Sequence, residues 1–273
     1  MIQVVISASF DDLRSRHMRL LQEAQIIGEV HVLLWTDESV RAIDGDEPKF
    51  SQEERQYFVE AIRYVDRVSL TEVPSRDSLP LQQIEKGTTW VLEESQADSE
   101  KEAFCQEHGL EYCVIPEQQL QGYPEPEGVT HETSSKGQKK VLVTGCYDWF
   151  HSGHVRFFEE VSKLGDVHVV VGHDANIKLL KGEGHPMYNE DQRRYMAGSI
   201  RFVKRALVSS GDGWLDAEPE IERIKPDIYA VNEDGDVPEK RDYCEAHGIE
   251  YRVLKRTPKA GLPKRQSTDL RGI

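Results

Sequence analysis

The chain has 273 residues and a formal net charge of −15, from 49 acidic and 34 basic residues. This balance argues against binding of DNA or RNA through bulk electrostatic attraction. We find no run of 18 apolar residues and no signal-peptide layout at the N-terminus, so we expect no membrane span. The four cysteines form no CxxC pair and no metal-binding spacing, which favours a reducing, cytoplasmic environment.

The sequence repeats itself after about 130 residues. Three segments of the first half match three of the second in the same order: 4–37 with 141–174, 53–67 with 191–205, and 105–112 with 244–251. The longest match has no gap and 11 identical positions of 34. Such a fixed period indicates a tandem duplication of one structural unit.

The duplication predicts two domains, at 1–122 and 138–273. Between them, residues 123–137 are rich in Pro, Gly, Ser and Glu, which is typical of a linker. The net charge is divided unequally, because residues 1–136 contain 27 acidic and 12 basic residues, whereas residues 137–273 contain 22 of each. The copy that can hold an anionic ligand is therefore expected to be the second.

Short apolar runs alternate with helical patterns in the second unit. The predicted strands are 140–145, 166–172, 206–210, 227–231 and 250–254. A helix is predicted after His151, with Val155, Phe158 and Val161 on its buried face, and further helices at 189–200, 214–225 and 236–247. This alternation predicts an α/β fold in which each unit is a doubly wound parallel sheet. Such sheets bind ligands at the carboxyl ends of the strands, where the strand order reverses.

The first strand of the second unit leads into the sequence TGCYDWFHSGH. His151 and His154 lie three residues apart at the start of a helix, and Gly153 between them allows a ligand to approach the backbone. A helix N-terminus with free N–H groups favours phosphate, and two imidazoles there can donate hydrogen bonds. The alternative from these residues alone is one histidine that packs and one that is solvated.

Four segments in order resemble the nucleotidyltransferase superfamily that includes cytidylyltransferases and ADP-heptose-type adenylyltransferases. They are GCYDWFHSGHVRFFEEV, DANIKLLKGEGHPMYNEDQRR, SIRFVKRAL and KRTPKAGLPKRQSTDLR. The resemblance implies two Rossmann-like domains and an enzyme that transfers a nucleotidyl group to a phosphorylated substrate and releases pyrophosphate. It also implies Mg²⁺ that arrives with the nucleoside triphosphate, without ligands from the protein.

The resemblance assigns roles to residues of the second unit. His151, His154 and Lys181 would hold the triphosphate and stabilise its transition state. Nucleotide contacts are implied for Thr144, Gly145, Cys146, Tyr147, Gly153, Arg201, Arg256, Thr257, Ser267 and Thr268. Four carboxylates are further candidates: Asp148, Asp174, Asp234 and Asp236. For Asp148 we favour an ordering role at the turn and helix entry.

The first unit lacks most of these residues. His151 aligns with Arg14, Gly153 with Arg16, Lys181 with Asp44 and Arg256 with Glu117. Asp44 and Glu117 thus put negative charge where a triphosphate needs positive charge, and Arg16 removes the close approach at the glycine. We interpret the first unit as a pseudo-domain with a structural, dimer-forming or regulatory role.

The resemblance favours CTP, because Arg201 and the Arg256–Thr257 pair resemble cytidylyltransferases of the glycerol-phosphate and phosphoethanolamine kind. The acceptor would be a small phosphorylated alcohol, amine or sugar. One alternative is an ATP-dependent adenylyltransferase, and another is a non-catalytic nucleotide-binding regulator. The segment 258–266 is an insertion relative to the family pattern, and it is either a solvated basic loop or a lid over phosphates. A homodimer is a further expectation.

Overall fold

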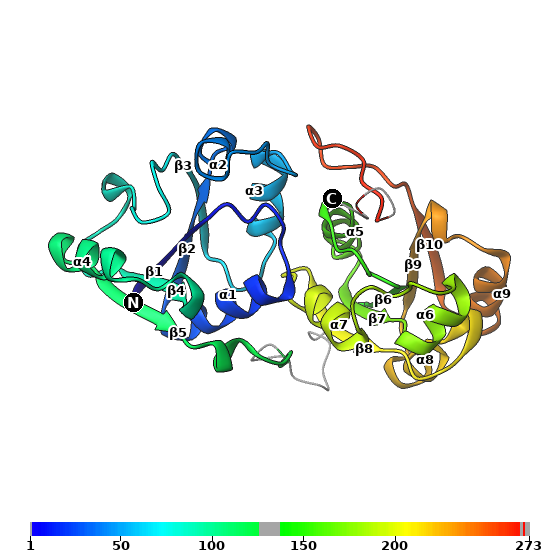
Figure 1. Cartoon of the computed structure of the whole chain (residues 1–273). Helices are drawn as coiled ribbons and strands as arrows, with labels where there is room; N and C mark the ends of the chain where they lie inside the picture. Colours follow the sequence, from blue (N-terminus) through cyan, green and yellow to red (C-terminus); the bar gives the residue numbers. More distant parts are fainter. Residues whose placement is uncertain (1, 126–136, 268–269, 271–273) are drawn as a thin grey trace. The chain divides into compact units, whose positions relative to one another are not determined.

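A computed structural model describes residues 2–125, 137–267 and 270. The chain divides into two compact units, Met1–Gly122 and Tyr123–Ile273, which are treated separately below (Figure 1). Within the described residues, every helix is too short or too polar to cross a membrane. Most of the predicted linker lies outside these residues, as does Thr268.

The first unit is a five-stranded parallel sheet in the order β3-β2-β1-β4-β5. Its strands are β1 (Gln3–Ala8), β2 (Glu29–Trp35), β3 (Arg67–Thr71), β4 (Thr89–Glu93) and β5 (Glu111–Ile115). Its helices are α1 (Ser15–Ile27), α2 (Asp37–Asp44), α3 (Gln52–Glu60) and α4 (Ser99–His108). Short 3-10 turns are η1 (Leu81–Gln83), η2 (Glu94–Gln96) and η3 (Glu117–Leu120).

The second unit repeats this topology with the order β10-β9-β6-β7-β8. Its strands are β6 (Lys140–Gly145), β7 (Asp166–Val171), β8 (Val203–Val208), β9 (Ile228–Asn232) and β10 (Glu250–Leu254). Its helices are α5 (Ser152–Val161), α6 (Asp174–Lys181), α7 (Glu190–Gly198), α8 (Glu218–Ile224) and α9 (Pro238–Ala246). Two 3-10 turns are η4 (Gly213–Leu215) and η5 (Glu233–Gly235). The predicted α/β fold with a parallel sheet in each unit is confirmed.

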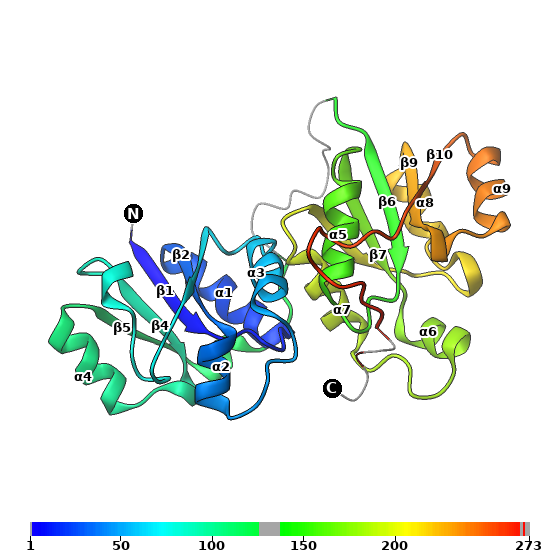
Figure 2. The ribbon, with the colours of Figure 1, turned by 90° about the horizontal axis from the view of Figure 1, so that it is seen from above.

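Both faces of the second sheet are covered, as its apolar strands require. Leu142 packs in a core with Ile221 of α8 and Cys244 of α9. Its neighbours Val141 and Val143 point to the opposite face and are also fully buried. Figures 1 and 2 show α5 and α7 on one side of this sheet and α8 and α9 on the other. The predicted buried residues of α5 are likewise fully enclosed.

One predicted strand of the second unit differs from the structure by more than one residue at its ends. The run at 206–210 was expected to be a strand, but β8 ends at Val208. The two serines that follow turn away because their side chains bind a neighbouring segment. Ser209 donates its hydroxyl to Asp216 at 2.7 Å, and Ser210 donates its hydroxyl to Glu220 at 2.8 Å. The N–H of Ser209 still donates to the carbonyl of Val171 at 2.8 Å, and beyond it these side-chain hydrogen bonds hold the chain.

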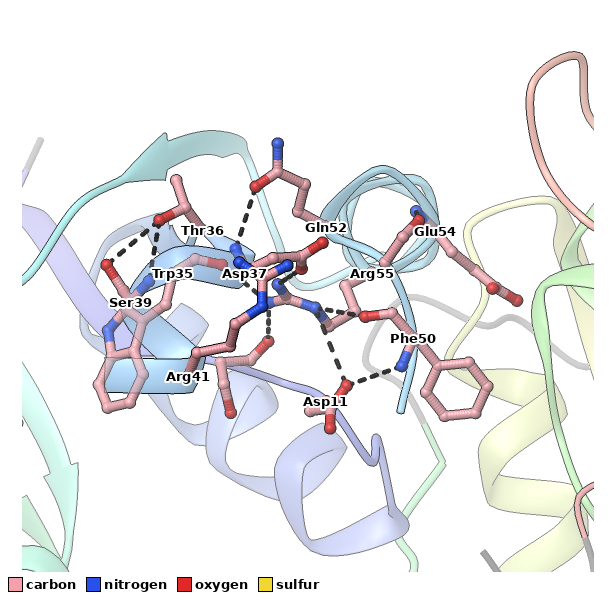
Figure 3. Close-up of polar contacts among 12 residues, drawn as sticks. Asp11, Trp35, Thr36, Asp37, Ser39, Arg41, Phe50, Gln52, Glu54 and Arg55 are labelled. Atoms are coloured by element: carbon pink, nitrogen blue, oxygen red, sulfur yellow. Dashed lines mark hydrogen bonds and ion pairs between the residues drawn. The ribbon is translucent and has the colours of Figure 1, made fainter. Parts of the chain in front are cut away.

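A buried arginine ties the same three loops together in each unit. In the first unit it is Arg55, which donates to the carbonyls of Ser9, Trp35 and Phe50 and to the carboxylate of Asp37 (Figure 3). In the second it is Arg193, which donates to the carbonyls of Cys146, Gly172 and Tyr188 and to the carboxylate of Asp174. Both units keep this network, so the carboxylate of Asp174 binds Arg193 as that of Asp37 binds Arg55.

Candidate active site in the second unit

A pocket of about 350 Å³ opens at the carboxyl ends of β6 and β9, where the strand order of the second sheet reverses. Doubly wound sheets bind their ligands at this point. The pocket brings together most of the residues that the sequence assigned to a nucleotide site. From that set, its lining contains Thr144, Gly145, Cys146, Tyr147, Asp148, Gly153, His154, Lys181, Asp234, Arg256 and Ser267.

The two histidines cap the helix that begins beside the pocket. His151 is the N-cap of α5, and its Nδ1 accepts a hydrogen bond from the N–H of Gly153 at 3.0 Å. Nδ1 of His154 accepts from the N–H of His151 at 3.3 Å. The rings stack, with 4.0 Å between their centroids. Because both Nδ1 atoms act as acceptors, each neutral ring carries its proton on Nε2.

Burial keeps both histidines uncharged. Burial, with the charges of Arg256 and Arg265 added, lowers the pKa of His151 to about 3. Burial and the neighbouring His151 also lower the pKa of His154 well below its usual value. Nε2 of His151 is buried and has no hydrogen-bond partner among the described residues. A buried N–H without a partner is costly, so an acceptor that reaches it gains affinity.

These pKa values predict that the second unit loses stability in acid. The unfolded state takes up a proton on His151 below its ordinary pKa of 6.5, whereas the folded state does so only near 3. The free energy of unfolding therefore falls as the pH falls through this window. We expect urea unfolding to show a smaller loss between about pH 7 and pH 5 for His151→Asn than for the wild type. The exposed His247→Asn control should follow the wild type, and an equal loss in all three proteins would contradict the assignment.

Two glycines leave space for neighbouring rings, Gly153 for His151 and Gly145 for Tyr147. A Cβ added at Gly153 would lie 2.8 Å from Cε1 and 2.9 Å from Nδ1 of His151, closer than real side chains approach. A Cβ at Gly145 would lie 2.9 Å from the ring of Tyr147, which itself has a positive φ of 52°. The ring of His151 therefore occupies the space beside Gly153, and the approach of a ligand to this backbone stays a prediction.

Cations reach the pocket from three segments. Lys181 is the last residue of α6, and Arg256 follows β10. The guanidinium of Arg256 donates to the carboxylate of Asp234 and to the carbonyl of Arg265. Lys240 also lines the pocket, and the sequence motifs do not include it. The sequence feature that could have identified Lys240 is its place in the first turn of α9, the helix that follows the carboxyl end of β9.

Two hydroxyls that were expected to contact phosphate already have protein partners. Oγ1 of Thr144 lies 2.7 Å from the hydroxyl oxygen of Tyr229. The hydroxyl of Ser267 donates to the carbonyl of Trp149 at 3.2 Å. The Trp149 ring is buried and packs edge-on against Tyr188, with 6.0 Å between the ring centroids. These contacts order the pocket wall.

Asp148 accepts hydrogen bonds from the backbone just before α7. One of its carboxylate oxygens accepts from the N–H groups of Met187 and Tyr188, at 2.7 and 3.1 Å. These amides lie just before α7, whose N-cap is Asn189. Asp11 makes the same pair of contacts in the first unit, with the N–H groups of Lys49 and Phe50.

Five predicted residues that the structure describes are not in the lining of the pocket: His151, Asp174, Arg201, Thr257 and Asp236. Arg201 precedes β8, at the amino end of a strand that runs parallel to β7. The pocket lies at the carboxyl ends of the strands. Arg201 lies at the amino end of β8, away from the pocket. Thr257 lies in a small neighbouring hollow, and Asp236 accepts from Arg241 and from the hydroxyl of Tyr251.

Comparison with known proteins decides the family. Residues 142–257 match the family model described as cytidylyltransferase-like. A FAD synthase from Aciduliprofundum boonei (strain DSM 19572 / T469) is 36% identical over 136 residues, which are 49% of this chain and 84% of that protein. The chain belongs to the cytidylyltransferase-like family of nucleotidyltransferases.

Other similar proteins cover different shares of this chain. A bifunctional protein HldE from Campylobacter concisus (strain 13826) is 38% identical over 103 residues, which are 37% of this chain and 21% of that protein. The match therefore spans about a fifth of that relative. A lipopolysaccharide core biosynthesis protein from Thermoplasma volcanium GSS1 is 25% identical in its crystal structure, with a TM-score of 0.38 over 45% of this chain and 99% of that chain.

The insertion at 258–266 folds back onto the cytidylyltransferase-like unit. Lys259 forms an ion pair with Glu159 of α5 at 2.8 Å. The carbonyl of Arg265 accepts from Arg256 at 3.0 Å and lies 3.7 Å from the position of a Cβ on Gly153. The segment is thus attached beside the helix N-terminus that carries the two histidines.

The first unit has the same local structure at the start of α1 as the second unit has at the start of α5. Nδ1 of His17 accepts from the N–H of Arg14 at 3.0 Å, as His154 does in the second unit. Phe10 has a positive φ of 47°, close to that of Tyr147 at the aligned position. The backbone framework is therefore common to both copies.

In the first unit an ion pair joins two of the positions that align with predicted site residues. Arg16, at the position of Gly153, donates to both carboxylate oxygens of Glu117, at the position of Arg256. It also donates to Glu93 of β4. The Glu117 carboxylate raises the pKa of Arg16. An internal ion pair therefore joins the two walls between which a triphosphate would lie.

Proposed function

We propose that the second unit transfers AMP from ATP to the phosphate group of a small acceptor and releases pyrophosphate. The observation that carries this proposal is the pair of neutral, stacked histidines, His151 and His154, at the N-terminus of α5. His154 lines a pocket that also holds Lys181 and Arg256, and His151 stacks on His154 with its own Nε2 buried. Fixed donors and cations around a dry site favour the charge that develops on a transferring phosphoryl group.

The reaction needs no covalent intermediate with the protein. An oxygen of the acceptor phosphate attacks the α-phosphorus of ATP. A new phosphorus–oxygen bond forms while the bond to the oxygen bridging the α- and β-phosphorus breaks, and its electron pair leaves with pyrophosphate. The histidine N–H groups hold phosphate oxygens, and Lys181 balances the charge of the leaving pyrophosphate.

Two observations favour ATP over CTP. The FAD synthase relative aligns over most of its own length, and the FAD in its name contains an AMP unit. Of the two features that suggested CTP, Arg201 lies at the far edge of the sheet from the pocket. CTP remains the second candidate, because Arg256 of the Arg256–Thr257 pair does line the pocket.

Pyrophosphate release tests the proposal. The full chain would be incubated with Mg²⁺, with ATP or CTP, and with each of FMN, a sugar 1-phosphate and glycerol 3-phosphate. We expect turnover with ATP and one of these phosphate esters. Turnover with CTP alone would select the second candidate. No turnover with any pair, together with no thermal shift from either nucleotide, would contradict both.

Magnesium would enter with the nucleotide. No group of three or more metal-ligating side chains is present in the described part of the chain. We propose that the ion is held by triphosphate oxygens and water, as is common for Mg²⁺. EDTA should then abolish turnover without lowering the melting temperature of the free protein.

We also propose that the protein is located in the cytoplasm, because ATP is supplied there and the cysteine pattern favours a reducing environment.

Replacing Lys181 should weaken catalysis through loss of a phosphate-binding cation. We expect Lys181→Met to lower kcat/KM for ATP about 10- to 100-fold. The matched control is Lys178→Met on the same helix, because Lys178 forms an exposed ion pair with Glu183 and does not line the pocket. Equal activity of the two variants would remove Lys181 from the mechanism.

We further propose that the inserted loop 258–266 is a lid over the nucleotide and that the first unit is non-catalytic. The attachment of Lys259 to Glu159 and the contact between Arg265 and Arg256 support the first idea. The ion pair of Arg16 with Glu117 supports the second, because it occupies the equivalent of the triphosphate site.

A further inference from the structure

Lys240 is a cation of the second-unit pocket to which the matching motifs assign no role. It is the third residue of α9, and it lines the pocket together with His154 and Lys181. Its ammonium group donates to the carbonyl of Gly235 at 3.3 Å and lies 5.8 Å from the centre of the Tyr229 ring. A cation is attracted to the face of a tyrosine ring at this distance, so both contacts hold the charge at the carboxyl end of β9.

Within the described part of the chain, no carboxylate forms an ion pair with Lys240. Asp216 and Asp236 act on it only from a longer distance, and they bind Ser209 and Arg241 instead. Burial lowers the pKa of Lys240, because a charge that is partly removed from water is less stable. Water also screens such a charge less, so it attracts an anion more strongly than an exposed lysine does.

The first unit has a lysine at the aligned position, and there carboxylates neutralise it. Extending the third repeat match toward the N-terminus, without a gap, aligns Lys101 with Lys240. Lys101 lines a cavity of about 1010 Å³ at the carboxyl ends of the first sheet and forms ion pairs with Asp77 and Asp98. Asp98 is the N-cap of α4, whereas the N-cap of α9 is Val237. The second unit therefore lacks a carboxylate that neutralises the lysine in the first.

The two lysines of the second-unit pocket come from opposite sides of the central strand. Lys181 ends α6, which follows β7, and Lys240 lies in α9, which follows β9. Because β6 lies between β7 and β9 in the sheet, these two strands are about 10 Å apart. His154 belongs to the helix that follows β6. The order of the strands thus gives the pocket one lysine on each side of the histidine.

In-line transfer of a nucleotidyl group needs positive charge on both sides of the α-phosphorus. The leaving pyrophosphate lies on one side and the attacking phosphate on the other. We have assigned Lys181 to the pyrophosphate, and Arg256 is already bound to the carboxylate of Asp234. Among the cations that line the pocket in the described part of the chain, Lys240 is left for the attacking phosphate.

We propose that Lys240 binds the phosphate group of the acceptor and thereby selects phosphate monoesters over uncharged alcohols. The proposal rests on nucleotidyl transfer in the second unit, and it assigns to that reaction a substrate-binding residue outside the matching motifs. The ammonium group attracts the acceptor, and it lowers the repulsion between the acceptor phosphate and the α-phosphate of ATP.

Binding of inorganic phosphate tests the proposal without turnover. The full chain would be saturated with Mg²⁺ and α,β-methylene-ATP, which cannot release pyrophosphate, and titrated with phosphate in a calorimeter. We expect Lys240→Met to bind phosphate at least about tenfold more weakly than the wild type, the usual effect of removing a charged hydrogen-bond donor. Lys240→Arg, which keeps the charge, and Lys163→Met, at an exposed lysine outside the pocket, should bind phosphate as the wild type does. All three variants should bind α,β-methylene-ATP with unchanged affinity.

A second variant keeps the lysine and neutralises it. Val237→Asp places at the N-cap of α9 the carboxylate that α4 has in Asp98. Asp98 accepts from the backbone N–H of Lys101 at 2.8 Å and pairs with its ammonium group. We expect Val237→Asp to keep or raise the melting temperature, because Asp is a favoured N-cap, and to weaken phosphate binding as Lys240→Met does.

Turnover separates this proposal from the proposed function. With the acceptor that reacts, Lys240→Met should raise KM for that acceptor at least about tenfold and leave KM for ATP unchanged. The proposal would be overturned if the wild type bound no phosphate, or if Lys240→Met bound it equally well. An equal loss of α,β-methylene-ATP affinity would also overturn it, because the lysine would then hold the nucleotide. Absence of turnover with every acceptor would contradict nucleotidyl transfer instead, and the binding comparison would still show whether Lys240 holds a phosphate.

Discussion

His154→Asn is expected to lower turnover about 10²- to 10³-fold, the usual cost of removing one fixed donor to transition-state charge. The amide oxygen of Asn can replace Nδ1 as the acceptor from the N–H of His151, so the helix cap remains. What the variant removes is the Nε2–H group. The change should therefore appear in the rate of pyrophosphate release with little change in melting temperature.

The repeat supplies a matched control for this variant. His17 occupies the same place in the first unit and accepts from the N–H of Arg14 in the same way. We expect His17→Asn to leave pyrophosphate release unchanged. A comparable loss in both variants would mean that the effect comes from helix capping, and full activity of His154→Asn would remove the ring from catalysis.

Gly153→Arg is expected to abolish ATP binding. This substitution places in the second unit the residue that the first unit has at the aligned position, Arg16. Any Cβ there meets the ring of His151 at 2.8 Å, so the ring must leave its packed position. The new guanidinium would also lie near Arg256, without the carboxylate that Glu117 provides in the first unit. The ATP-induced rise in melting temperature should vanish.

The reverse change controls for the geometry of the first unit. Arg16→Gly restores the glycine but leaves Glu93 and Glu117 in the cleft. We expect it to gain no ATP binding, since two carboxylates then face the triphosphate without a partner. If Gly153→Arg kept its ATP-induced shift, or if Arg16→Gly acquired a second ATP site, the explanation of the inactive copy would be wrong.

The sequence predicted the fold because the repeat and the apolar runs are local signals. The spacing of Val155, Phe158 and Val161 defines the buried face of α5, and all three side chains are fully enclosed. The segments after β6 and β9 meet at one pocket because the carboxyl ends of parallel strands share one edge. The order of strands and motifs along the chain was therefore enough to place Thr144, His154 and Asp234 together.

What the sequence could not predict depends on contacts between distant segments. Arg201 lies in a matching motif, but its place at the amino end of β8 removes it from the pocket. Lys240 carries no motif and reaches the pocket only because α9 begins beside β9. The replacement of Gly153 by Arg16 and of Arg256 by Glu117 was visible in the alignment, whereas the ion pair between Arg16 and Glu117 and the cavity beside it required the fold.

The number of ATP molecules bound per chain tests the central claim most directly. Isothermal titration of the full chain with ATP and Mg²⁺ should give one site per chain in the wild type and none in Gly153→Arg. A value of two per chain, or one site that survives Gly153→Arg, would contradict the claim that only the second unit retains a nucleotide site.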